Sequence, residues 1–145
     1  MLDRIAPDSL VEGQLVANRF RVLRPLVPSP FYWAYEVEDS TAHGPGPKTR
    51  PWLRVARQRL PGEVTAETMV ERAQTQLSTV HRHLAQLLAV TLYEGRLCHV
   101  LMPVSGVSLE SLIEVEGERR SPLARPEHTI RCIAEALTHL HGNGI

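Results

Sequence analysis

Two close pairs of histidines are the side chains whose spacing most directly suggests chemistry. His81 and His83 lie two residues apart, and so do His139 and His141. Two imidazoles at this spacing can ligate zinc from a strand, where alternate residues share a face, but on a helix they point in different directions. Neither pair is accompanied by a Cys-x-x-Cys or His-Glu-x-x-His sequence. We therefore expect no metal site.

A second stretch with chemical meaning is "VLRPLVPSPFYWAYEVED", residues 22–39, which has the pattern of two strands joined by a loop. Such a loop can hold phosphates when its backbone N–H groups close around the oxygens, which glycine allows and a side chain obstructs. This loop contains no glycine, and Pro28 and Pro30 have no N–H to donate. The aromatic residues 31–33 occupy further space, so we do not expect a phosphate cradle here.

The overall composition is that of an ordinary globular chain. The sequence has 145 residues, of which 43% are hydrophobic and 22% charged, which suits one domain with a real core. Sixteen basic residues balance 16 acidic ones, and binding to a polyanion usually requires a basic excess. We therefore expect no nucleic-acid partner, and we interpret the local arginine clusters as solvated faces.

Neither a membrane span nor a secretory signal is visible. No apolar run approaches the ~20 residues that cross a bilayer, and the N-terminal "MLDRIAPDSLVEG" has no apolar core. Cys98 and Cys132 each lie in an apolar segment, which is typical of reduced core thiols in a cytosolic protein. The expected location is the cytoplasm.

The elements that must position these residues follow from hydrophobic periodicity and breakers. Residues 1–18 form a lead-in with little periodicity. Strands are expected at 19–26, 31–39 and 52–60, and as a hairpin within 87–104 that turns at Glu94-Gly95. Helices are expected at 65–80, 108–115 and 126–141.

The two longer helices each carry an apolar stripe. In the first, which Thr65 would cap, the stripe is Ala66, Met69, Val70, Ala73, Leu77 and Val80. In the last, which begins at Pro126 and which Gly142 would cap, the stripe is Ile130, Ile133, Ala134, Leu137 and Leu140.

Several short segments, in this order, resemble bacterial eukaryotic-like Ser/Thr protein kinases over residues 18–145. They are "RFRVLRPL", "YEVED", "VARQRL", "HRHLAQLL", "VLMPVSGVSLESLI" and "IAEALTHLHGNGI". The resemblance implies an α+β fold: a kinase small lobe at 19–103, with a five-stranded antiparallel sheet and one αC-type helix. The hinge and the αD- and αE-like helices of an incomplete large lobe would then follow at 104–145.

The resemblance also locates the positions that carry kinase chemistry. The three loop glycines would fall at Val27, Ser29 and Tyr32. The lysine of the third strand would fall at Gln58, because Val55 and Ala56 then match the residues over the adenine. A slip of one residue offers Arg57 instead.

The partner of that lysine is a glutamate on the αC helix, and the family spacing places Arg72 there. Glu71 points away from the apolar stripe, so it is expected to be a surface charge. The resemblance thus implies that the lysine–glutamate ion pair is absent at both ends.

The hinge would run through Met102, Pro103 and Val104, after Leu101 at the gatekeeper position. The Met102 carbonyl and the Val104 N–H remain able to bind adenine, and Ala56 and Leu101 would line an apolar slot; the alternative is ordinary packing between lobes. The candidate nucleotide-binding residues are therefore Val27, Ala56, Gln58, Leu101, Met102 and Val104. ATP and Mg²⁺ are expected only if this degenerate pocket still binds them.

The sequence stops at Ile145, before the point where the family continues into H-R-D-x-x-x-x-N and D-F-G. No catalytic residue is expected in this chain, which alone should not transfer phosphoryl groups. The stripe of the last helix then needs a cover, either a missing large lobe or a protein partner.

The preferred hypothesis is a catalytically inactive pseudokinase fragment that acts as an interaction or regulatory module. The alternatives are the N-terminal portion of an active ATP-dependent Ser/Thr kinase, and an unrelated α+β domain that lacks the kinase sheet.

Overall fold

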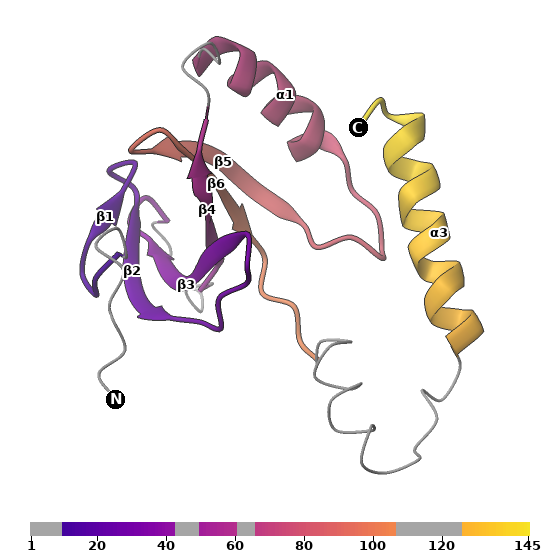
Figure 1. Cartoon of the computed structure of the whole chain (residues 1–145), viewed down its shortest axis with the longest axis horizontal. Coiled ribbons are helices and arrows are strands. Elements are labelled where there is room, and N and C mark those ends of the chain that lie inside the picture. Colours follow the sequence, from indigo (N-terminus) through magenta and orange to yellow (C-terminus); the bar gives the residue numbers. More distant parts are fainter. Residues whose placement is uncertain (1–9, 43–49, 61–65, 107–125) are drawn as a thin grey trace. The chain divides into compact units, whose positions relative to one another are not determined.

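The computed structural model describes residues 10–42, 50–60, 66–106 and 126–145 (Figure 1). The chain divides into two compact units: a sheet unit, Met1–Ser78 with Gln86–Pro103, and a helix unit, Thr79–Ala85 with Val104–Ile145. The described residues contain a six-stranded antiparallel sheet and two helices, which confirms the expected α+β class. The helix expected at 108–115 lies outside the described residues.

The sheet has the order β1-β2-β3-β4-β6-β5, and all neighbouring strands are antiparallel. Its strands are β1 (Leu15–Val16), β2 (Phe20–Pro25), β3 (Tyr32–Asp39), β4 (Trp52–Arg59), β5 (Leu87–Tyr93) and β6 (Arg96–Leu101). The last five lie where the sequence predicts strands. β1 makes the sheet one strand larger than expected.

Two turns show why one hairpin was predictable and the other was not. Glu94 and Gly95 both have positive φ, 49° and 73°, as a two-residue hairpin turn requires, and the expected turn is confirmed. The turn from β1 to β2 also uses positive φ, at Ala17 (52°) and Asn18 (53°). It contains no glycine, and a non-glycine residue rarely adopts this conformation, so the sequence pattern does not reveal it.

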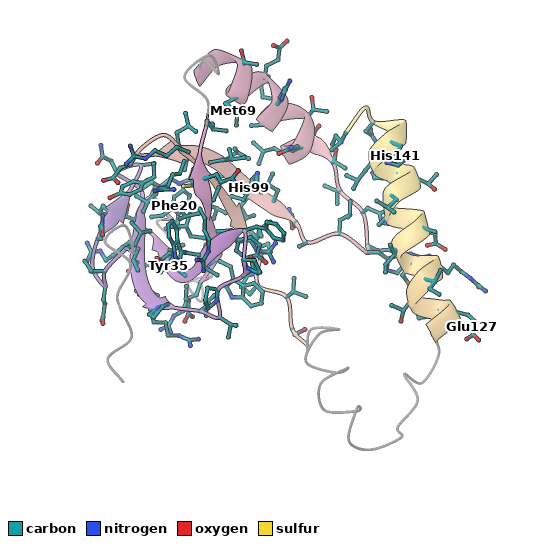
Figure 2. The ribbon with its side chains drawn as sticks, viewed as in Figure 1. Phe20, Tyr35, Met69, His99, Glu127 and His141 are labelled. Carbon is teal, nitrogen blue, oxygen red and sulfur yellow. The ribbon has the colours of Figure 1, made fainter. Side chains whose placement is uncertain are left out.

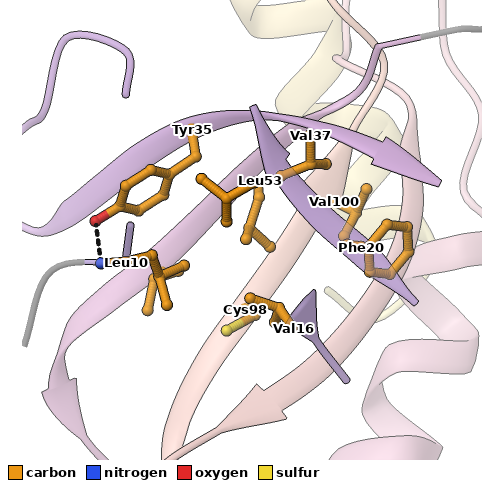
Figure 3. Packing of buried hydrophobic residues seen from close by; sticks show 10 residues of the cluster. Leu10, Val16, Phe20, Tyr35, Val37, Leu53, Cys98 and Val100 are labelled. Carbon is orange, nitrogen blue, oxygen red and sulfur yellow. Dashed lines mark hydrogen bonds between the residues drawn. The ribbon is translucent and has the colours of Figure 1, made fainter. Parts of the chain in front are cut away.

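The core of the sheet unit lies on one face of the sheet, which we call the core face (Figure 3). Strand alternation brings most of its residues to the same side: Val16, Phe20, Val22, Tyr35, Val37, Leu53, Val55, Cys98 and Val100. Leu10, which precedes β1, completes the cluster. The Tyr35 hydroxyl accepts a hydrogen bond from the Leu10 N–H at 3.1 Å, which ties the segment before β1 to this core. Figure 2 shows Phe20 and Tyr35 among the crowded side chains of the sheet.

The residues that β3 contributes to the core face are Trp33, Tyr35 and Val37. Tyr35 and Val37 are buried, and Trp33 packs against them. Phe31 precedes the strand and remains 79% exposed.

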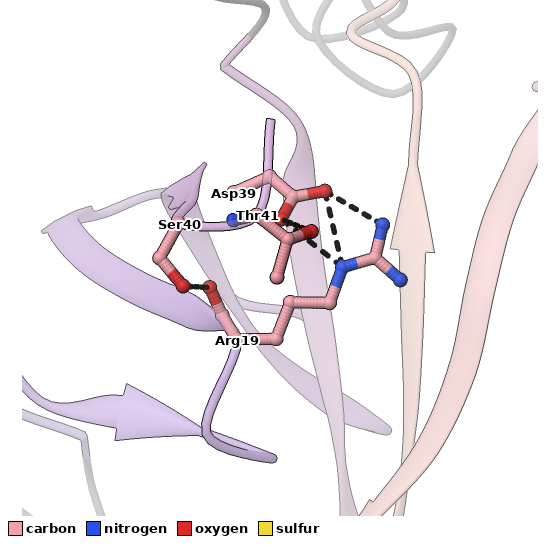
Figure 4. Close-up of polar contacts among 4 residues, drawn as sticks. All are labelled: Arg19, Asp39, Ser40 and Thr41. Carbon is pink, nitrogen blue, oxygen red and sulfur yellow. Dashed lines mark hydrogen bonds and ion pairs between the residues drawn. The ribbon is translucent and has the colours of Figure 1, made fainter. Parts of the chain in front are cut away.

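An ion pair closes the hairpin of β2 and β3 at the end opposite its loop (Figure 4). The Arg19 guanidinium donates to both carboxylate oxygens of Asp39, at 2.7–3.1 Å. Thr41 donates to Asp39 through its N–H and its hydroxyl, and the Ser40 hydroxyl donates to the Arg19 carbonyl. The hydrogen bonds from Arg19 are the main reason that the pKa of Asp39 lies well below its usual range.

Helix α1 (Ala66–Ser78) contacts β5 within the sheet unit. Ala73 is buried and Met69 half-buried, as the expected stripe requires. The C-terminal end of that stripe is wrong: Leu77 is 36% exposed, and Val80 lies beyond the last helical residue and is 67% exposed.

Helix α3 (Pro126–Gly142) confirms the last expected helix to within one residue. Its predicted apolar stripe is largely uncovered in the structure, since Ile130, Ile133 and Leu137 are 66%, 50% and 47% exposed. The buried residue of this helix is Ala136. Neither described helix is both long and apolar enough to cross a membrane.

The two cysteines are free thiols with different surroundings. Cys98 belongs to the buried core, and burial raises its pKa to about 12. Cys132 on α3 is partly exposed, so the expectation of a core thiol is wrong for this residue. Its helix leaves much of its apolar surface open, and burial inferred from local sequence alone could not anticipate that.

Candidate functional site

The face of the sheet opposite the core, which we call the outer face, carries the positions that would roof an adenine. Ala34 pairs with Arg54, Tyr32 with Ala56, and Trp52 with Leu101, so alternation places all six on this face. Ala34 and Leu101 are each 8% exposed and Ala56 is half-buried. Sequence reasoning did not single out Ala34; its signal is a small residue within an aromatic run.

The structure brings Ala56 and Leu101 to the same face but does not make them neighbours. The cross-strand partner of Leu101 is Trp52, four residues along β4 from Ala56. At about 3.3 Å per residue, this separation is roughly 13 Å. These two side chains therefore do not meet in one compact slot.

The surroundings of Ala56 on the outer face are aromatic and basic. Its cross-strand partner is Tyr32, and the Arg54 guanidinium lies 4.7 Å from the centre of the Tyr32 ring. Arg54 also pairs with His99 on β6. The pKa of His99 is lowered by burial and then by Arg54. The Arg54 guanidinium thus lies on the part of the outer face where an adenine-binding surface would need to be apolar.

The loop between β2 and β3 uses its backbone donors on itself. The Leu26 N–H donates to the Ala34 carbonyl at 2.8 Å, and the Ser29 N–H donates to the Tyr32 carbonyl at 2.9 Å. The Ser29 hydroxyl accepts from the N–H groups of Phe31 and Tyr32, both at 3.2 Å.

Two of the six loop residues, Pro28 and Pro30, have no N–H at all. Within this described loop, only the Val27 N–H has no acceptor in the hairpin. The Val27 side chain itself is 89% exposed. A phosphate cradle needs several convergent donors, and this loop presents one.

Near the end of β4, the two candidate replacements for the lysine lie in different environments. Arg57 has its guanidinium 5.2 Å from the centre of the Trp33 ring, on the core face, and Arg96 approaches the same ring at 5.2 Å. The Arg57 N–H donates to the Phe31 carbonyl at 2.9 Å, and its carbonyl accepts from the Arg96 guanidinium. Gln58 follows and is exposed.

On α1, neither candidate for the partner glutamate turns inward. Glu71 and Arg72 are both exposed, whereas the next residue, Ala73, is buried. No ion pair joins α1 to β4 in the part of the chain that the structure describes.

The hinge positions are only partly available to a ligand. The Met102 N–H donates to the Gln86 carbonyl at 2.9 Å, which leaves its carbonyl as the group that can face adenine. Pro103 has no N–H. Val104 is 51% exposed and belongs to the helix unit.

Comparison with known proteins places this geometry on a protein-kinase-like fold. The kinase domain of PknI from Mycobacterium tuberculosis superposes with a TM-score of 0.74 at 18% identity, over 94% of this chain and 53% of that domain. A double mutant of the same domain gives the same values, and a single mutant gives a TM-score of 0.72. The chain thus spans about half the length of the kinase domains it matches. Neither a protein-family model nor a curated protein matches the sequence.

Proposed function

We propose that this chain is a piece of a kinase-like domain with a degenerate nucleotide pocket, a pseudokinase piece that acts as an interaction or regulatory module. The observation that carries the proposal concerns the backbone of the loop between β2 and β3. Apart from that of Val27, its N–H groups donate hydrogen bonds within the hairpin, and its two prolines have none. Polyphosphates are normally held by several backbone donors or by cations placed beside them. This loop presents one N–H without an acceptor in the hairpin, and the nearby guanidinium groups of Arg54 and Arg57 lie over the rings of Tyr32 and Trp33.

The other candidate positions support the same conclusion. Gln58 carries no charge where the family has lysine, and the exposed Arg72 stands where the family has glutamate. The adenine slot is divided, because Ala56 and Leu101 are not neighbours and Arg54 lies between the aromatic and imidazole groups beside them. Catalysis by this chain alone is not proposed. Its free thiols support a cytoplasmic location, where thiols stay reduced.

Nucleotide binding tests the proposal directly. The full chain is titrated with a fluorescent ATP analogue, with and without Mg²⁺, and unlabelled ATP is used as competitor. We expect no Mg²⁺-dependent binding up to millimolar nucleotide. Micromolar, Mg²⁺-dependent and competable binding would overturn the degenerate pocket.

The second candidate function is the N-terminal portion of an active Ser/Thr kinase, with Arg57 in place of the lysine. The observation in its favour is that a guanidinium does lie at the end of β4. It predicts nucleotide binding that Arg57→Gln abolishes and Gln58→Ala leaves intact. Intact H-R-D-x-x-x-x-N and D-F-G sequences encoded downstream would support it further.

The exposed apolar stripe of α3 supports the inference that another polypeptide covers this helix, either the rest of a large lobe or a separate protein. Ile130, Ile133 and Leu137 are at least 47% exposed, and burying such a side chain is typically worth about 1.5–3 kcal/mol. Without that cover, we expect the chain to self-associate in analytical ultracentrifugation. Ile133→Lys should shift it toward monomer, and an unchanged association would argue against this role for α3.

A further inference from the structure

The helix unit contains a pocket that the kinase resemblance does not account for. It is open, with a volume of about 590 Å³, and its lining comes from the 79–85 segment and from α3. His81 and Arg82 line it from the segment, and Arg131, Thr138 and His139 line it from the helix. Residues 58 positions apart, His81 and His139, thus form one site.

The lining of this pocket has more positive than negative charge, because it contains two arginines, Arg82 and Arg131, and one carboxylate. Glu135 is the carboxylate in its lining, and that carboxylate is already engaged. Its Oε2 atom accepts a hydrogen bond from Arg82 at 2.8 Å and lies 3.4 Å from His83 Nε2. The pKa of Glu135 is accordingly lowered, chiefly by Arg82. Arg131 has no carboxylate partner among the described residues.

The two histidines of the lining are stacked, with ring centroids 5.0 Å apart and planes at 28°. Nδ1 of His81 faces the His83 N–H at 3.2 Å and accepts its hydrogen bond. The neutral imidazole of His81 therefore carries its proton on Nε2, as a donor. Protonating Nδ1 would break this bond and place a cation against His139.

The electrostatics of His81 agree with this geometry. Its pKa is lowered first by burial, and then by His139, His83 and Arg82, while Glu135 acts in the opposite direction. The site thus holds imidazoles and guanidinium groups at close range with too little negative charge to balance them. An anion is the ligand that would relieve this repulsion.

We propose that this pocket binds a phosphate-like oxyanion, carried either by free phosphate or by a phosphorylated side chain. The Arg131 guanidinium presents planar paired donors suited to such oxygens, and His81 Nε2, His139 and the remaining N–H groups of Arg82 complete the donor set. The Thr138 hydroxyl is excluded from it, because it donates to the Ala134 carbonyl at 2.8 Å.

Binding should depend on pH in a defined direction. An anion favours the protonated form of His81, so affinity should rise as the pH falls from 7.5 to 5.5. The charged groups around His81 are His83 and Arg82 on its own segment, and Arg131, Glu135 and His139 on α3. Phosphate itself loses a charge near pH 6, so sulfate, which stays a dianion, is the probe for this measurement.

The test is histidine-selective ¹⁵N–¹H NMR on the full chain, following His81 and His139. The probes are inorganic phosphate, sulfate, and a phosphoserine peptide with its unphosphorylated form. We expect saturable shifts of both imidazoles, with affinity for sulfate greater at pH 5.5 than at 7.5. No shift at tens of millimolar of any probe, or affinity that is unchanged by pH, would overturn the proposal.

Two arginine variants make the test specific. Arg131→Gln removes the unpaired guanidinium and should weaken binding about tenfold, the loss expected from one charge-assisted hydrogen bond. Arg72→Gln removes an exposed arginine on α1 and should leave affinity unchanged; an equal loss in both variants would show that only net charge matters. Tighter binding of the phosphoserine peptide than of phosphate assigns a phosphorylated protein, and equal binding assigns the free ion.

Discussion

The core face and the outer face of the same sheet differ in what their residues do. The core face joins aliphatic and aromatic side chains from five strands into one buried cluster (Figure 3). The outer face carries Ala34, Ala56 and Leu101, together with Arg54 beside His99. Because the main buried cluster lies on the core face, exposed positions of the outer face and of the loop can change with little cost to the fold. A kinase-like architecture can therefore tolerate the loop residues found here.

The strongest way to break this comparison is to remove a side chain from the core face. Leu53 is 0% exposed near the start of β4, so Leu53→Ala should lower the free energy of unfolding by about 2–5 kcal/mol. Urea denaturation measures the loss. Val27→Ala, at an 89% exposed loop position, is the matched control and should stay within about 0.5 kcal/mol of wild type. Equal losses in the two variants would contradict the division between faces.

A smaller effect is expected where the core face holds the segment before β1. Tyr35→Phe removes the acceptor of the Leu10 N–H, now at 3.1 Å, and should cost about 1 kcal/mol. Amide exchange of Leu10 should accelerate more than that of Val100, which lies deep in β6. Unchanged exchange at Leu10 would mean that this hydrogen bond does not anchor the segment.

The two ends of the β2–β3 hairpin extend the comparison. One end is closed by Arg19 and Asp39 (Figure 4), and the other by the loop that contains Pro28 and Pro30. The pKa of Asp39 is depressed in the folded state, so its contribution is complete above its unfolded pKa of about 3.9 and is lost as the pH falls below it. The Arg19 and Asp39 side chains are 45% and 17% exposed, and solvent screening limits the contribution to about 1 kcal/mol.

Asp39→Asn should therefore be less stable than wild type at pH 7 and approach it near pH 2, as measured by thermal unfolding across pH. If the stability difference between Asp39→Asn and wild type were the same at both pH values, the charge of the Asp39 carboxylate would not be its cause.

Sequence reasoning succeeded where a local pattern decides the structure. Alternation located five strands, and a glycine marked the turn at Gly95. It failed where distant residues decide. Spacing pairs His81 with His83, and their rings do lie 5.5 Å apart, but spacing does not reveal that His81 also stacks on His139. The exposure of Phe31 and of the α3 stripe likewise depends on which surfaces the rest of the chain covers.

The candidate site was harder to predict than the fold for a further reason. The pairing of β4 with β6 shifts between Val55 and Arg59, the stretch that contains both Arg57 and Gln58. A register shift of this kind is invisible in sequence, and one residue decides which face a side chain occupies. The hydrogen bonds of the loop N–H groups likewise depend on the folded geometry. The sequence shows the two prolines, but it does not show that the Ser29 hydroxyl accepts two hydrogen bonds.

The smallest expected effect sharpens the comparison most. Gln58 is exposed, so Gln58→Lys should change stability by no more than about 0.5 kcal/mol, although it restores the lysine that the family resemblance implies. We expect no gain of Mg²⁺-dependent nucleotide binding, because the loop still presents only the Val27 N–H. Gln58→Arg is the matched control for added charge. If Gln58→Lys alone conferred micromolar binding of ATP with Mg²⁺, the missing cation and not the loop would be what separates this chain from a nucleotide-binding kinase.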